Sequence, residues 1–147
     1  MYATEREYIK IITKLIKYKA NINIQDKYGW SALMIASNNN YLNIVNLLLK
    51  GNNNLQNNFG ETALIISSEN GYLTIVKKLL EYNISINLKN NNNNTAYIKA
   101  CKNNYKNIAI ILKIYRKNEI KIILKKWNRN NIILPMDLIN LIIDFII

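Results

Sequence analysis

The sequence contains no histidine, one cysteine, one proline and four glycines in 147 residues. Histidine is the only side chain that ordinarily changes its charge near neutral pH, and it is also the commonest metal ligand. One cysteine and nine scattered carboxylates do not provide the ligands of a zinc site. Four glycines form no glycine-rich phosphate loop. We therefore expect no enzyme activity, no catalytic or metal-binding residue, no cofactor and no small-molecule substrate.

The single cysteine also excludes a disulfide framework, which suits a reducing compartment. Near the N-terminus, Glu5, Arg6, Glu7 and Lys10 interrupt every early apolar run, so we expect no secretory signal. These two features predict a cytoplasmic protein. Half of the residues are apolar, which is enough for a core in one domain or one array.

The sequence contains three copies of one repeat. The strings GWSALM, GETALI and NNTAYI begin at Gly29, Gly60 and Asn93, and each is followed by a tyrosine-led string: YLNIV, YLTIV or YKNIA. A half copy of the later part precedes them at residues 7–16. A period near 33 residues is typical of a solenoid of helix-turn-helix units. Such a fold supplies a surface for partners and rarely a reaction.

Each copy predicts the same local elements. A short extended finger leads to a first helix that opens at Ser31, Thr62 or Thr95, where a hydroxyl can accept an orphan backbone N–H. A break then separates the first helix from a second one, at Asn40, Gly71 and Asn104. The second helix carries an apolar face that a neighbouring repeat must cover. Cys101 stands where the other copies have a small serine, so we interpret it as a packing residue.

This order of residues resembles the ankyrin repeat over about residues 8–115. The family's usual proline is replaced by alanine and its usual histidine by an apolar residue, as the following positions show: Ala32, Ala63 and Ala96, then Met34, Ile65 and Ile98. Asn93 replaces the third loop glycine, which asparagine tolerates because it enters left-handed conformations more easily than most residues. The resemblance implies an all-α solenoid of stacked helix-turn-helix units, with short β-hairpin fingers and extra C-terminal helices.

In this family the concave side binds the target, through finger tips and first-helix faces. The resemblance therefore implies a target-binding set made of Lys27, Tyr28, Trp30, Asn38, Asn39, Asn58, Phe59, Glu61, Glu69 and Asn70. Three of them are large aromatics on turns where the repeat core does not require them, and aromatics are common anchors of interfaces. The asparagine run at residues 90–94 is interpreted as a relaxed repeat loop.

The C-terminal end departs from the repeat. Pro135 suits the first turn of a helix, and the residues after it are apolar on more faces than a capping helix requires. Burial of a large apolar side chain contributes roughly 1.5–3 kcal/mol of free energy, which is lost if the side chain stays exposed to water. The apolar surface of this helix therefore predicts a binding partner. Thirteen residues that include two aspartates are too short to span a bilayer.

The same segment resembles the opening of an F-box, the Leu-Pro-led motif that docks on the Skp-type adaptor of cullin-RING ubiquitin ligases. Its place behind ankyrin repeats is similar to the PRANC domain of poxvirus ankyrin proteins, which would put the protein in a host cytoplasm. The resemblance implies an adaptor-binding set of Leu134, Pro135, Leu138, Ile142 and Phe145. The protein would then recruit a substrate to a ubiquitin ligase. The alternative is a plain interaction scaffold whose last helix only caps the array.

These patterns divide the chain into five parts. They are a partial N-terminal repeat at 1–25, ankyrin repeats at 26–56 and 57–89, a degenerate ankyrin repeat at 90–117, and a C-terminal helical F-box-like segment at 118–147. We expect a monomer that binds a protein target.

The net charge of +11 is uneven, because residues 99–129 hold ten lysines or arginines against Glu119 alone. Such a stripe could serve nucleic acid, an anionic membrane or an acidic partner. It is more often a solvated face, and no RNA-binding or zinc-finger motif accompanies it. We therefore do not expect a nucleic-acid or membrane partner.

Overall fold

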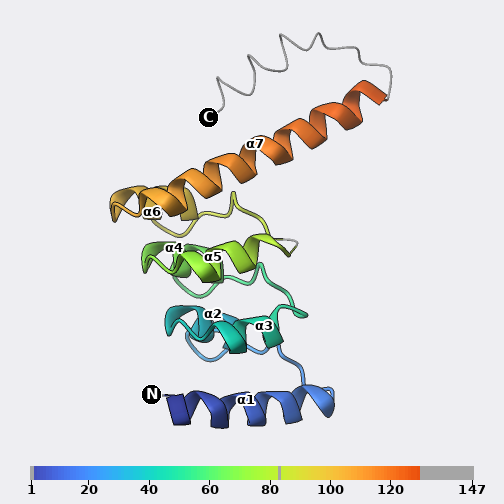
Figure 1. Cartoon of the computed structure of the whole chain (residues 1–147), viewed down its shortest axis with the longest axis vertical. Helices are drawn as coiled ribbons and strands as arrows, with labels where there is room; N and C mark the ends of the chain where they lie inside the picture. The colour runs from blue at the N-terminus through green and yellow to red at the C-terminus, as the bar shows by residue number, and fades with distance from the viewer. Residues whose placement is uncertain (1, 83, 130–147) are drawn as a thin grey trace. The chain divides into compact units, whose positions relative to one another are not determined.

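The structure, a computed structural model, describes residues 2–82 and 84–129 (Figure 1). Within these residues it contains seven helices and no strand: α1 (Tyr2–Lys17), α2 (Ala32–Asn38), α3 (Leu42–Leu48), α4 (Ala63–Glu69), α5 (Leu73–Leu80), α6 (Ala96–Lys102) and α7 (Lys106–Arg129). The predicted all-α class is confirmed. The adaptor-binding set from Leu134 to Phe145 lies outside the described residues.

The chain forms two compact units, Met1–Ala109 and Ile110–Ile147, and the first contains the helices α1 to α6 and the start of α7. There α2 packs on α4 and α4 packs on α6, which makes a row of first helices. A second row runs beside it, because α1 contacts α3 and α3 contacts α5 (Figure 1). The pairs α2–α3 and α4–α5 also pack together, as two helices of one repeat must.

Local hydrogen bonds begin each first helix where the sequence predicts it. The hydroxyls of Ser31, Thr62 and Thr95 accept from the backbone N–H three residues later, over 3.2 to 3.3 Å. The breaks between paired helices also stand at the predicted positions, and all three have positive φ: Asn40 (+58°), Gly71 (+76°) and Asn104 (+61°). Asparagine and glycine are the residues that enter this region at least cost.

The core consists of the second-helix faces and a strip of small residues on the first helices. Ile75, Val76 and Leu79 of α5 are fully buried. Ser67 and Ala100 have no exposed surface either, and their small side chains let neighbouring first helices approach closely.

Cys101 corrects our packing interpretation, because its side chain is exposed while Ser37 and Ser68 at the same repeat position are fully buried. Ser37 lies in α2 and Ser68 in α4, and each of these helices packs on the next first helix of the row. In the part of the chain that the structure describes, α6 is the last first helix, so no further helix of that row covers Cys101.

The helix α7 spans the predicted boundary between the last repeat and the C-terminal segment. It runs without interruption from Lys106 to Arg129, and the division between residues 117 and 118 falls inside it. Its first residues belong to the repeat unit, where Ile108 is buried, and the rest belong to the second unit. The second helix of the last repeat and the segment after it are therefore one continuous element.

Candidate protein-binding surface

The three fingers have the same internal structure, which is built on one polar side chain. Asp26 Oδ1 accepts from the backbone N–H groups of Tyr28 and Trp30, over 2.9 and 2.8 Å. Asn57 and Asn90 make the same pair of bonds in the second and third fingers. The backbone N–H of the same residue also donates across the finger, as from Asp26 to the carbonyl of Trp30 over 3.0 Å. The side chain thus satisfies the N–H at the finger tip and the one two residues after it.

The predicted β-hairpins are absent from the described fingers, because the backbone bonds across each finger are too few to make strands. They contain one isolated antiparallel bridge, between Gln25 and Ser31. The asparagine run at 90–94 is likewise an ordered turn rather than a relaxed loop. Asn90 and Asn94 are buried, and Asn93 adopts a φ of +58°.

Neighbouring fingers are joined through their backbones. The N–H of Asn58 donates to the carbonyl of Tyr28 over 3.1 Å, and the N–H of Asn91 donates to the carbonyl of Phe59 over 3.0 Å. Gln25 Nε2 also donates to the carbonyl of Gln56 in the next finger, over 2.9 Å. The fingers therefore form one connected row, in which each tip is fixed by the next.

This row requires glycine at two positions. A Cβ on Gly29 would lie 2.8 Å from the backbone nitrogen of Asn58, and one on Gly60 would lie 2.9 Å from that of Asn91. Asn93 occupies the same place in the third finger, and within the described residues no further finger approaches it. All three positions have a positive φ, but only the first two are also closely approached by the next finger. Glycine is therefore required at Gly29 and Gly60, whereas asparagine is tolerated at position 93.

Two exposed aromatic rings stand on adjacent finger tips. Tyr28 is 54% exposed and Phe59 is 59% exposed. Lys27 Nζ lies 4.9 Å from the centre of the Tyr28 ring, a cation–π distance. Trp30 is half-buried at the base of the first finger, and Asn92 is the third finger's counterpart of the two tip rings.

The other predicted residues form a second row at the C-terminal ends of the first helices. Asn70 Nδ2 donates to Asn38 Oδ1 over 3.1 Å. Lys99 Nζ lies 2.7 Å from Glu69 Oε1, and Asn103 Nδ2 donates to the carbonyl of Glu69, also over 2.7 Å. A helix of seven residues is about 10 Å long, so this row is separated from the finger row by that length.

The ten predicted residues thus fall into two groups. The structure places six in the finger row, namely Lys27, Tyr28, Trp30, Asn58, Phe59 and Glu61. It places the other four in the helix-end row, namely Asn38, Asn39, Glu69 and Asn70. Sequence reasoning missed Lys99 and Asn103, which continue the helix-end row. The spacing of Asn39, Asn70 and Asn103 could have revealed it.

Part of the basic stripe is used inside the repeats. Lys99 pairs with Glu69, and Lys102 Nζ donates to Asn94 Oδ1 over 2.9 Å. Glu119, the single acid of the segment, is half-buried, and burial raises the pKa of its carboxyl. These contacts favour a structural role for at least the first lysines of the stripe.

The described residues, 2–82 and 84–129, contain neither a metal-binding cluster nor a helix that could span a membrane. No group of three histidine, cysteine, aspartate or glutamate side chains there could hold a metal ion. No helix in that part of the chain is long and apolar enough to cross a membrane.

Comparison with known proteins adds one match. The family model described as ankyrin repeats, three copies, matches residues 1–90 and 50–126. No curated protein matches the chain. The matched ranges together include all three fingers and all three first helices.

Proposed function

Because the chain belongs to the ankyrin-repeat family, whose repeats serve as protein-interaction modules, we propose that its row of finger tips binds a protein target. The observation that carries the proposal is the pair of exposed rings, Tyr28 and Phe59, on neighbouring fingers. Aromatic side chains supply large contact area and are enriched among the residues that dominate binding energy.

The rigidity of the fingers supports this proposal. Backbone bonds between fingers and the paired bonds of Asp26 and Asn57 hold both tips before any partner arrives. A preorganised surface loses less conformational entropy on binding than a flexible loop does. Lys27 beside the Tyr28 ring and Glu61 at the base of the second finger give the surface both charges, so the target should be anchored by apolar contact and oriented by its polar rim.

Site-specific photo-crosslinking tests the proposal. A photoreactive phenylalanine at position 28 or 59 should capture the same protein from cytosol. At position 82, where Tyr82 is 37% exposed after α5, the same probe should not capture it. Capture only at position 82, or different proteins at 28 and 59, would contradict a shared finger-tip site.

Trp30 provides a quantitative test once that target is identified. Trp30→Ala should weaken its binding by about 2 kcal/mol, as expected for a central aromatic anchor. The ring is half-buried, so circular dichroism and the Tm should be measured on the same variant. Unchanged affinity with a lowered Tm would show that Trp30 supports the finger without touching the target.

We further propose that the protein acts as a substrate-recruiting adaptor. The support is the resemblance of the segment from Leu134 to Phe145 to an F-box, which would bind a Skp-type adaptor. The double variant Leu134→Ala with Pro135→Ala should lose capture of that adaptor and keep the Tm of the repeats. If the wild type captures no Skp-type adaptor and removal of residues 132–147 lowers the Tm, the segment caps the array instead.

A further inference from the structure

Each exposed ring of the finger row is accompanied by a polar group, the side-chain amide of an asparagine from the next finger. Asn58 Nδ2 donates to the carbonyl of Lys27 over 3.2 Å, and Asn91 Nδ2 donates to the carbonyl of Asn58 over 3.0 Å. A carbonyl only accepts, so the nitrogen of each amide must face the preceding finger. The oxygen of each amide is therefore turned away from that bond.

The two amide oxygens lie at the glycines that follow the rings in the sequence. A Cβ placed on Gly29 would be 2.8 Å from Asn58 Oδ1, and one on Gly60 would be 2.6 Å from Asn91 Oδ1. Both asparagines are exposed, and neither oxygen accepts a hydrogen bond within residues 2–82 and 84–129. The first two finger tips thus each present an aromatic ring and, at the adjacent glycine, an unused acceptor.

The acceptors are held as firmly as the rings. Asn58 makes two bonds to the first finger, from its backbone N–H to the carbonyl of Tyr28 and from its side chain to that of Lys27. Asn91 makes the equivalent two bonds to the second finger, at Phe59 and Asn58. A preorganised acceptor loses little conformational entropy when a donor binds to it.

The pair of ring and acceptor recurs once per repeat, and this recurrence sets the distance between its two copies. Each finger leads into a first helix, and α2 packs directly on α4. The axes of packed helices lie about 8–10 Å apart, and the bond from Asn58 to Tyr28 holds the finger tips in the same register. A ligand that uses both pairs must repeat an apolar side chain and an N–H donor at about that distance.

Among regular backbone conformations, polyproline II meets this requirement. It has three residues per turn, so residues i and i+3 lie on one side about 9 Å apart, and its N–H groups make no internal bonds. In a β-strand, side chains on one face recur about every 6.7 Å, which does not match. In an α-helix the interior N–H groups already bond to carbonyls of the same helix, so they cannot donate to the two oxygens.

We infer that the finger tips bind an extended segment of the target in the polyproline II conformation. The inference rests on the proposed function, because it describes the segment that the rings of Tyr28 and Phe59 contact. Two apolar anchors, three residues apart, pack on the two rings, and their backbone N–H groups donate to Asn58 Oδ1 and Asn91 Oδ1. The anchors themselves are not proline, since proline has no N–H, whereas the residues between them can be.

Synthetic peptides of one composition test the spacing. The probe has two leucines separated by two prolines and flanked by further prolines, because a residue before proline is held in the extended region. Two controls have the same composition, with one or three prolines between the leucines. A third control keeps the order of the probe but carries N-methylleucine at both anchors, which removes the two donors. Binding of each fluorescent peptide to the whole chain is followed by anisotropy.

Saturable binding of the probe is expected, and each of the three controls should bind at least about tenfold more weakly. The double variant Tyr28→Ala with Phe59→Ala should abolish saturable binding. Asn91→Leu should weaken the probe but leave the N-methyl peptide unchanged, because that peptide makes no bond to the amide oxygen. The matched variant Asn46→Leu alters an exposed asparagine of α3 and should leave binding of the probe unchanged.

Four outcomes would overturn the inference. They are absence of saturable binding by the probe, equal binding of the peptides with other spacings, no effect of N-methylation, and a captured target whose crosslinked segment is α-helical. Capture of one protein at positions 28 and 59 together with any of these outcomes would leave the finger-tip site in place and remove only the polyproline II segment. Circular dichroism of each variant separates loss of binding from loss of fold.

Discussion

The middle of the repeat stack and its two ends carry the same sequence pattern but bury it differently. Ile75 in the middle is fully buried, and its counterpart Ile11 at the N-terminal end is 56% exposed. Ser68 in the middle is fully buried, and its counterpart Cys101 in the last first helix is exposed. A residue's role in such an array therefore depends on which helices stand beside it, as well as on its own repeat position.

The largest expected loss of stability comes from truncating Ile75, and the matched comparison is truncation of Ile11. Ile75→Ala should lower the free energy of unfolding by about 3 kcal/mol, because it removes buried methyl groups and leaves a cavity. Ile11→Ala should lower it by less than about 1 kcal/mol, since the side chain is half exposed. Urea denaturation followed by circular dichroism measures both. Equal losses would mean that α1 is as closely packed as α5.

A smaller loss of stability is expected from a substitution at Gly60 in the second finger, and the matched comparison is Asn93 in the third finger. Gly60→Asn should lower the free energy of unfolding by about 2 kcal/mol, because the new Cβ would meet the backbone of the third finger. The reverse change, Asn93→Gly, should alter it by less than about 1 kcal/mol. Thermal unfolding of the two variants gives the comparison. A harmless Gly60→Asn change would remove close approach as the reason for glycine.

The smallest effect is one that should not depend on position. Thr62→Ala and Thr95→Ala should each lower the free energy of unfolding by about 1 kcal/mol, because each removes the N-cap bond of a first helix. Similar values for the middle and the last repeat would show that capping is local. A value for Thr95 near zero would mean that α6 is already frayed in the wild type.

The difference between features set by nearby residues in the sequence and features set by neighbouring helices explains what the sequence could predict. The caps at Ser31, Thr62 and Thr95 and the breaks at Asn40 and Asn104 depend on residues a few positions away, and each was predictable from the repeat. The fold class followed from the spacing of these signals. The assignment to ankyrin repeats agrees with the family match over residues 1–126.

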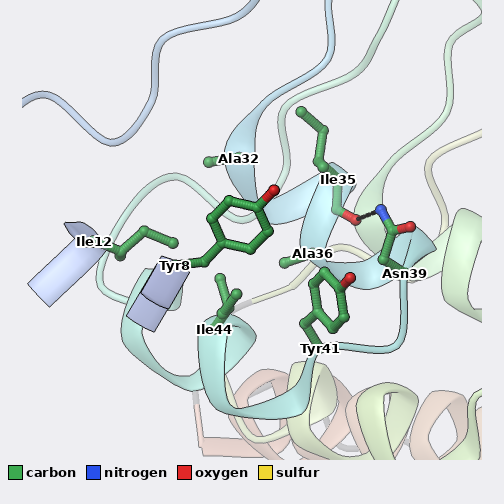
Figure 2. Close-up of a pocket in the computed structure, with 8 residues that line it drawn as sticks. All are labelled: Tyr8, Ile12, Ala32, Ile35, Ala36, Asn39, Tyr41 and Ile44. Atoms are coloured by element: carbon green, nitrogen blue, oxygen red, sulfur yellow. Dashed lines mark hydrogen bonds between the residues drawn. The ribbon is translucent and has the colours of Figure 1, made fainter. Parts of the chain in front are cut away.

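Features that depend on spatial neighbours were harder to predict. Cys101 was interpreted as buried because the repeat position is buried elsewhere, yet the helix that would cover it is absent from the described residues. The paired bonds of Asn57 and Asn90 are local, but they were also missed, because about a fifth of the residues in the chain are asparagine and no single one stands out. The exposure of Ile35, which lines a pocket together with Tyr8 and Asn39 (Figure 2), was also missed, because the repeat pattern alone assigns that position to a packed face.

The affinity of the captured target for a finger-tip double variant tests the central claim most directly. Tyr28→Ala with Phe59→Ala removes both exposed rings and leaves the bonds of Asp26 and Asn57, since those bonds involve only backbone N–H groups at these positions. The account predicts at least a thirtyfold loss of affinity, about 2 kcal/mol, with an unchanged Tm, while Tyr82→Ala has no effect. An unchanged affinity for the double variant would contradict the proposal that the finger tips bind the target.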